Sequence, residues 1–256
     1  MNARMLTIFV FLISVFSVSG YAQKAKELRS EHFIITYAPE AEDYVYKVKD
    51  DAEYFYRKIT QEFGLIREKL WSWDDRTKII IAKDKEDYLK NFSCPTWSAA
   101  CVDYRNRVIY TYPLQKDFSF ILLHELTHII FREYIGYNKM PLWLDEGMAT
   151  YIEFRDNTMQ CQRLTLVTKK LIEENKYIKF KDINNMYSIA EGSDASLFYT
   201  QAFSMVSFLK ERFGRDDFAE FLSCLRSGSS LDDSLRKAFR SIENTESFES
   251  SWKRFY

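Results

Sequence analysis

Two histidines and a glutamate stand in this sequence at a spacing that suits metal chemistry. His124 and His128 are four positions apart, and Glu125 directly follows the first of them. Residues four apart lie on the same face of a helix, so both imidazoles can bind one metal ion without distorting the backbone. Glu125 would be rotated by about 100° from His124, where its carboxylate can reach a water on the metal. The pattern predicts a metal site with an adjacent general base.

A third ligand is offered further along the chain. Glu146 stands in the run WLDEGMA (residues 143–149), with 17 residues between it and His128. A turn over residues 136–140 would bring a second helix back against the first, and Gly147 would allow the two helices to approach closely. Three protein ligands with one open position are the arrangement of a catalytic zinc site. Glu146 is therefore the expected third ligand.

Two alternatives remain open on these residues. Asp145 is the alternative third ligand. We expect it rather to cap a helix, to support a ligand or to face solvent. The two motif histidines are alternatively core histidines with hydrogen-bond partners. The chain has three histidines, and the third, His32, falls in the first expected strand.

The elements that would position these residues follow from the periodicity of the sequence. Strands are expected over 31–37, 78–82 and 107–112, and helices over 41–63 and 85–91. From Asp117 onward the pattern is helical, over 118–134, 141–154, 159–175, 194–213, 217–225, 231–239 and 247–255, with a loop over 181–194. We therefore expect an α+β protein with a small mixed β-sheet lobe followed by a mostly helical lobe.

The overall composition excludes some classes of partner. The chain of 256 residues is 46% hydrophobic, which is enough for one sizeable core. Lys and Arg number 36 against 37 Asp and Glu, so the net charge is -1. This balance gives neither the basic footprint of a nucleic-acid-binding protein nor a polybasic membrane patch.

The first residues have the layout of a secretory signal peptide. Arg4 precedes an apolar stretch over residues 5–18, and small residues lead up to Ala22. We expect a signal peptide over residues 1–22, cleaved after Ala22, because the stretch is shorter than the about 20 residues that a stable membrane span needs. The alternative is an uncleaved anchor. The mature protein would be exported, to the periplasm or the outside of the cell.

Four cysteines fit an exported protein, because an even number permits two disulfides in an oxidising compartment. Cys94 and Cys101 flank a short loop, so we expect them to pair. Cys161 and Cys224 would then join the C-terminal half to itself, or would be buried free thiols.

The motif HELTH followed by WLDEGMA resembles the gluzincin metallopeptidases, the clan of thermolysin and the zinc aminopeptidases. The nearest pattern is the Peptidase MA-like family, and the run Tyr199-Thr200-Gln201…Phe208-Leu209…Gly214 also resembles it. The resemblance implies a zincin-like metallopeptidase fold over residues 23–256. The resemblance also implies that this domain consists of an α/β lobe (23–116) and a helical lobe (117–256), with the zinc site between them.

The same resemblance implies particular roles for the site residues. One Zn²⁺ per chain would be bound by His124, His128 and Glu146, with Glu125 as general base and later as proton donor. Tyr199 would occupy the place of the tyrosine that donates to the oxyanion in related aminopeptidases, unless it merely packs.

The resemblance also describes how substrate would be held. The strand over 107–112 would be a sheet edge that binds an extended peptide through main-chain hydrogen bonds. A GxMEN-type exopeptidase segment is missing from the sequence, so we expect an endopeptidase that acts on peptides or unfolded protein. The alternatives are a hydrolase of cell-wall peptide and a non-catalytic zincin-like binding or assembly module of the cell envelope. Glu125 favours catalysis, because binding a metal needs no base there.

Overall fold

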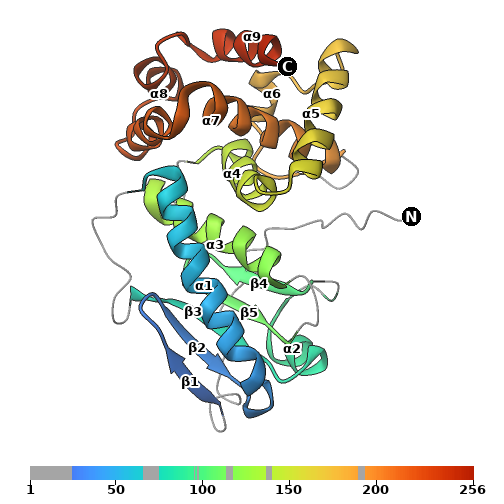
Figure 1. The fold of residues 1–256 in the computed structure, drawn as a ribbon, viewed down its shortest axis with the longest axis vertical. Helices are drawn as coiled ribbons and strands as arrows, with labels where there is room; N and C mark the ends of the chain where they lie inside the picture. The colour runs from blue at the N-terminus through green and yellow to red at the C-terminus, as the bar shows by residue number, and fades with distance from the viewer. Residues whose placement is uncertain are drawn as a thin grey trace. The chain divides into compact units, whose positions relative to one another are not determined.

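The computed structural model describes residues 25–65, 75–94, 96, 98–113, 118–136, 140–189 and 194–256 (Figure 1). The expected signal peptide and the expected boundary between residues 116 and 117 lie outside these ranges. The described residues form two compact units. We call them the sheet unit (25–60, 75–94, 96, 98–113 and 118–129) and the helical unit (61–65, 130–136, 140–189 and 194–256).

A mixed sheet of five strands forms the framework of the sheet unit. The strands are β1 (Lys26–Arg29), β2 (Phe33–Tyr37), β3 (Thr77–Ile81), β4 (Ala100–Asp103) and β5 (Val108–Thr111), in the order β1-β2-β3-β5-β4. The three central strands β2, β3 and β5 are parallel, and β1 and β4 run antiparallel to their neighbours. Ile79 and Ile81 of β3 are fully buried, as expected of a central strand.

The strand order corrects one expectation. We expected the strand over 107–112 to be a sheet edge, but β5 pairs with β3 on one side and with β4 on the other. The edge is β4, a strand that the sequence pattern did not predict. Any β-strand addition on this side of the sheet would therefore use β4.

Helices connect the parallel strands. The helix α1 (Glu42–Phe63) joins β2 to β3 and buries Val45, Val48 and Ala52 on one face. The short helix α2 (Lys85–Asn91) follows β3, and the Asp84 side chain caps it by accepting a hydrogen bond from the backbone N–H of Asp87. These helices lie where the helical spacing of apolar residues predicted them.

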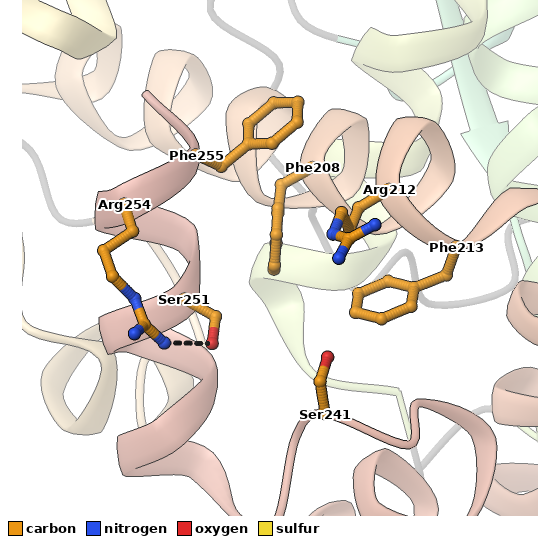
Figure 2. Close-up of a pocket in the computed structure, with 7 residues that line it drawn as sticks. All are labelled: Phe208, Arg212, Phe213, Ser241, Ser251, Arg254 and Phe255. Atoms are coloured by element: carbon orange, nitrogen blue, oxygen red, sulfur yellow. Dashed lines mark hydrogen bonds between the residues drawn. The ribbon is translucent and has the colours of Figure 1, made fainter.

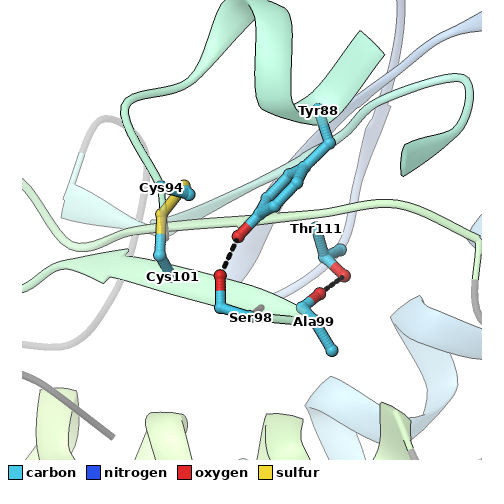
Figure 3. Close-up of a disulfide and its surroundings, with 6 residues drawn as sticks. All are labelled: Tyr88, Cys94, Ser98, Ala99, Cys101 and Thr111. Atoms are coloured by element: carbon cyan, nitrogen blue, oxygen red, sulfur yellow. Dashed lines mark hydrogen bonds between the residues drawn. A yellow bond between two sulfur atoms is a disulfide. The ribbon is translucent and has the colours of Figure 1, made fainter. Parts of the chain in front are cut away.

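A disulfide fastens β4 to the chain that follows α2 (Figure 3). Cys94 and Cys101 are bonded, with their Cα atoms 5.8 Å apart, which confirms the expected pair. Nearby, the Tyr88 hydroxyl lies 2.9 Å from the Ser98 hydroxyl, and the Thr111 hydroxyl donates to the Ala99 carbonyl at 3.0 Å. The start of β4 is thus held by one covalent link and by hydrogen bonds on both sides.

The helical unit contains the last residues of α1 and of α3 (Phe118–Ile135). Further helices follow: α4 (Leu142–Phe154), α5 (Thr158–Glu173), α6 (Phe180–Asn184), α7 (Ala195–Arg226), α8 (Leu231–Ala238) and α9 (Thr245–Phe255). The expected caps are present, because Asp194 accepts from Leu197 N–H and Ser230 accepts from Asp233 N–H. The expected helix end at Gly214 is a break inside α7, where φ is 85°.

Two features of the helical unit differ from expectation. Part of the expected loop over 181–194 is the helix α6.

Gly147 does make a close helix contact, but its partner is α7 rather than α3. A Cβ at Gly147 would lie 2.5 Å from the Ala202 carbonyl oxygen and 2.8 Å from a Val206 methyl, so no side chain fits there.

The second expected disulfide does not form. Cys161 and Cys224 are both free, and the Cys161 thiol instead donates to the Phe154 carbonyl at 3.1 Å. The free-thiol alternative therefore holds for this pair. Within the described ranges, no helix is both long and apolar enough to cross a membrane.

Candidate active site

The helix α3 carries the histidine motif in an apolar setting. Leu122, Leu126 and Ile129 are fully buried around it. The motif side chains are also buried, with exposed fractions of 6% for His124, 4% for Glu125 and 0% for His128. Burying polar side chains costs free energy unless they find partners, so this cluster of ionisable groups requires a partner or a bound ion.

The two imidazoles converge on one point. The Nε2 atoms of His124 and His128 are 3.2 Å apart, and the ring planes are inclined at 75°. Two nitrogens that coordinate one tetrahedral zinc, each at about 2.0–2.1 Å, lie about 3.3 Å from each other. The spacing within this helix therefore fits a shared zinc ion as well as a shared proton.

Glu146, the expected third ligand, lies in α4. Its side chain is buried, with an exposed fraction of 2%. Two histidine nitrogens and one carboxylate are a donor set that zinc accepts in catalytic sites. The role of Glu146 as a ligand stays a prediction.

Asp145, the alternative ligand, has another partner. Arg132 contacts its Oδ2 through Nε at 2.8 Å and through Nη2 at 2.6 Å. Arg132 lies one turn after His128 on α3, so this ion pair attaches the beginning of α4 to the end of the motif helix. Asp145 thus holds the helix that carries Glu146.

The aromatic cluster around Trp143 also fixes α4. The Trp143 ring contacts Phe180 and Phe248, with ring centroids 5.5 and 5.9 Å away. Its indole N–H donates to the Asn184 side chain of α6 at 3.1 Å. The tryptophan of the WLDEGMA run therefore has a structural role in orienting α4.

Tyr104 is a site residue that the sequence analysis missed. It directly follows β4, and its hydroxyl donates to Glu125 Oε2 at 2.9 Å. Its ring also packs edge-on against His128, with centroids 5.8 Å apart. The sequence holds one signal for this position: Asp103 and Asn106 mark a turn before the strand over 107–112.

Tyr199, the expected oxyanion donor, lies in the first turns of α7. Its ring contacts Phe198 edge-on at 5.7 Å, and its hydroxyl is buried. Its catalytic role stays a prediction.

A second group of potential ligands, Glu31, His32 and Glu53, has a structural explanation. Glu53 accepts hydrogen bonds from the His32 backbone N–H at 2.8 Å and pairs with His32 Nδ1 at 2.7 Å. Although burial raises the pKa of Glu53, its hydrogen bonds with His32 outweigh this and lower the pKa to about 2. Both carboxylate oxygens are thus engaged in attaching α1 to the chain before β2.

A cavity of about 440 Å³ lies in the helical unit and contains none of the expected site residues (Figure 2). Its lining comes from α7, α9 and the chain between α8 and α9, and consists of Phe208, Arg212, Phe213, Ser241, Ser251, Arg254 and Phe255. The chemistry of the histidine motif therefore does not depend on this cavity.

Comparison with known proteins identifies the family. Residues 99–256 match the Peptidase MA superfamily, and this match covers more than half of the chain. The protein belongs to that superfamily, a gluzincin-like family of metallopeptidases. No curated protein sequence matches the chain.

One solved structure supports the fold, and a second has a lower TM-score. Native yeast LTA4 hydrolase is similar, with a TM-score of 0.54 and 13% identity, over 89% of this chain and 38% of that one. The complex of yeast LTA4 hydrolase with bestatin has a TM-score of 0.49 and 14% identity, over 91% of this chain and 36% of that one. The chain spans well under half the length of these structures, and at such identity only the first likeness supports the fold. The expected α+β class is confirmed.

Proposed function

We propose that this protein is a zinc-dependent endopeptidase that hydrolyses extended peptides or unfolded protein. The observation that carries the proposal is the buried pair of His124 and His128, with Nε2 atoms 3.2 Å apart, on a helix whose buried Glu125 is the residue next to His124. Membership of the Peptidase MA superfamily supports the same class of activity.

The residues at the site fit zinc. His124, His128 and Glu146 would hold one ion per chain, since all three side chains are buried and carry donor atoms that zinc accepts. A bound zinc would supply a Lewis acid that polarises the scissile carbonyl and acidifies the attacking water.

Glu125 would move the protons of the reaction. It is one residue from the first ligand, and its carboxylate would take a proton from the attacking water and later donate it to the leaving amine. Tyr199 would donate a hydrogen bond to the oxyanion. The apolar residues around α3 keep bulk water out, so these polar interactions act in a medium of low dielectric constant.

The edge strand β4 would hold the substrate. One edge of β4 pairs with β5. The other edge pairs with no strand of the described sheet. An extended peptide could add to it through main-chain hydrogen bonds, a mode that depends little on side-chain identity. This is the physical basis for proposing an endopeptidase with broad sequence tolerance.

Export is part of the proposal and has independent support. The disulfide between Cys94 and Cys101 suits an oxidising compartment, as the layout of residues 1–22 does. The periplasm or the extracellular space would be the site of action.

Cleavage of fluorescein-labelled, unfolded casein by the zinc-loaded protein tests the proposal. We expect cleavage by the wild type, and a rate lower by several orders of magnitude in Glu125→Gln, since this change removes the proton carrier while keeping size and shape. Asp216→Asn, on an aspartate whose side chain is 86% exposed, should behave like the wild type. Equal, measurable rates in the wild type and Glu125→Gln would refute the role of Glu125. No cleavage by the zinc-loaded wild type would favour the non-catalytic module.

A further inference from the structure

Tyr104 occupies a position that links the sheet edge to the proposed base. It is the first residue after β4, and its hydroxyl donates to Glu125 Oε2 at 2.9 Å. Within the described residues, this is the one hydrogen bond found for the Glu125 side chain. A carboxylate that is only 4% exposed is oriented by the donors that reach it, and the Tyr104 hydroxyl is such a donor.

The turn that carries Tyr104 is held in one conformation. Asp103 accepts hydrogen bonds from the backbone N–H of Asn106 at 3.1 Å and from its side-chain amide at 2.7 Å. Arg107 closes the turn with φ at 55°, a left-handed conformation that is rare outside glycine. These bonds help to place Tyr104 relative to β4.

The other end of β4 is fixed as well. The disulfide of Cys101 with Cys94 holds the strand to the chain after α2, and Cys101 pairs in register with Tyr110 of β5. Tyr104 is therefore carried by a short strand that is fastened at both ends. Its hydroxyl can define the place of the Glu125 carboxylate more precisely than a side chain on a long loop could.

We propose that Tyr104 is a positioning residue for Glu125. Its hydroxyl holds one carboxylate oxygen, so that the carboxylate faces the attacking water in a single orientation. This inference rests on the proposed function and names a residue that acts through Glu125 rather than on substrate.

The alternative is that Tyr104 only packs against His128. Its ring contacts that histidine edge-on at 5.8 Å, and a phenylalanine would keep this contact. Tyr104→Phe therefore separates the two roles, because it removes the hydroxyl and leaves the ring. Tyr112→Phe is the matched control: it deletes a hydroxyl just after β5, from a ring that packs against Tyr88 at 5.1 Å.

The first experiment measures zinc content, kcat and KM on a quenched fluorescent peptide. We expect Tyr104→Phe to keep the zinc content and KM of the wild type and to lower kcat by about 10- to 100-fold, the usual effect of losing a supporting hydrogen bond. Tyr112→Phe should keep all three values. Loss of zinc from Tyr104→Phe, or an unchanged kcat, would overturn the positioning role.

A second experiment does not depend on activity. Urea unfolding of the metal-free protein compares Tyr104→Phe in the wild-type and Glu125→Ala backgrounds. Removal of the Tyr104 hydroxyl should lower the urea concentration at the unfolding midpoint only where Glu125 is present, because only then is a hydrogen bond lost. Equal shifts in both backgrounds would show that the hydroxyl does not hold Glu125.

The outcomes separate this inference from the proposed function. If Glu125→Gln is inactive and Tyr104→Phe has the wild-type kcat, the positioning role is wrong and the proposed function stands. If the zinc-loaded wild type cleaves nothing, or Glu125→Gln remains active, the proposed function is wrong and the positioning role is rejected with it.

Discussion

Arg132 and Asp145 form a two-pronged ion pair that joins the end of the motif helix to the helix of the third ligand. Both contacts reach the same carboxylate oxygen, at 2.8 and 2.6 Å, and the side chains are only 15% and 5% exposed. Since Glu146 is the next residue after Asp145, this pair fixes the backbone on which the proposed third ligand is carried.

Breaking that pair should weaken both the fold and the metal site. Asp145→Asn removes the negative charge that the largely buried Arg132 guanidinium contacts, so we expect the free energy of unfolding to fall by about 3 kcal/mol. Zinc affinity should fall by about 10- to 100-fold, because Glu146 loses its support. Urea unfolding and zinc titration measure the two effects. An Asp145→Asn variant with wild-type stability would show that the pair is not important in solution.

The disulfide should stabilise the sheet unit through β4. Replacing both Cys94 and Cys101 with serine opens a short loop, and we expect a loss of about 2–3 kcal/mol. Reductant should lower the melting temperature of the wild type and leave that of the double variant unchanged. Cys161→Ser, which alters a free thiol, should respond to reductant as the wild type does. Insensitivity of the wild type to reductant would count against the disulfide.

Gly147 should tolerate no side chain. The Cβ of an alanine would meet the Ala202 carbonyl oxygen at 2.5 Å, and backbone on a neighbouring helix cannot move aside easily. We expect Gly147→Ala to lower the free energy of unfolding by about 1–3 kcal/mol, as overpacking usually does. Thermal unfolding followed by circular dichroism measures this. A stabilised variant would mean that α4 and α7 are further apart than the structure shows.

Several parts of this architecture were predictable because their signals are local. The four-residue spacing of His124 and His128 defines one helix face. Asp194 and Ser230 cap helix starts with their side chains, and Gly214 marks a break within α7. The pairing of Cys94 with Cys101 needed only a short loop. Glu146 was expected as a ligand from the pattern of the WLDEGMA run.

Other parts depend on tertiary structure. β1 has mostly exposed residues and β4 has four half-buried ones, so neither shows an apolar alternation. The order of strands, which makes β4 rather than β5 the edge, is not contained in any one segment. Three further features depend on contacts between distant segments: the helix that Gly147 contacts, the separation of Cys161 from Cys224, and the hydrogen bond from Tyr104 to Glu125.

The pair of Glu53 and His32 should make stability depend on acid. The pKa of Glu53 is lowered from 4.5 to about 2 in the folded protein. Because the folded pKa lies below the unfolded one, the contribution is complete above about pH 4.5 and is lost as the pH falls towards 2. A shift of this size corresponds to about 3 kcal/mol.

Urea unfolding over a series of pH values tests this dependence. Glu53→Gln should be less stable than the wild type by about 3 kcal/mol between pH 5 and 7, and the difference should shrink towards pH 2. The exposed Glu27 offers a control, since Glu27→Gln should show no such dependence. A difference between wild type and Glu53→Gln that does not vary with pH would contradict the assignment.

The most direct test of the central claim is the zinc content of the purified protein, measured by inductively coupled plasma mass spectrometry. The wild type and Glu125→Gln should each contain about one zinc per chain, and His128→Ala should contain almost none, because it lacks one of the proposed ligands. Wild-type protein that holds no zinc and takes none up when zinc is added to the folded chain would contradict the proposed metallopeptidase.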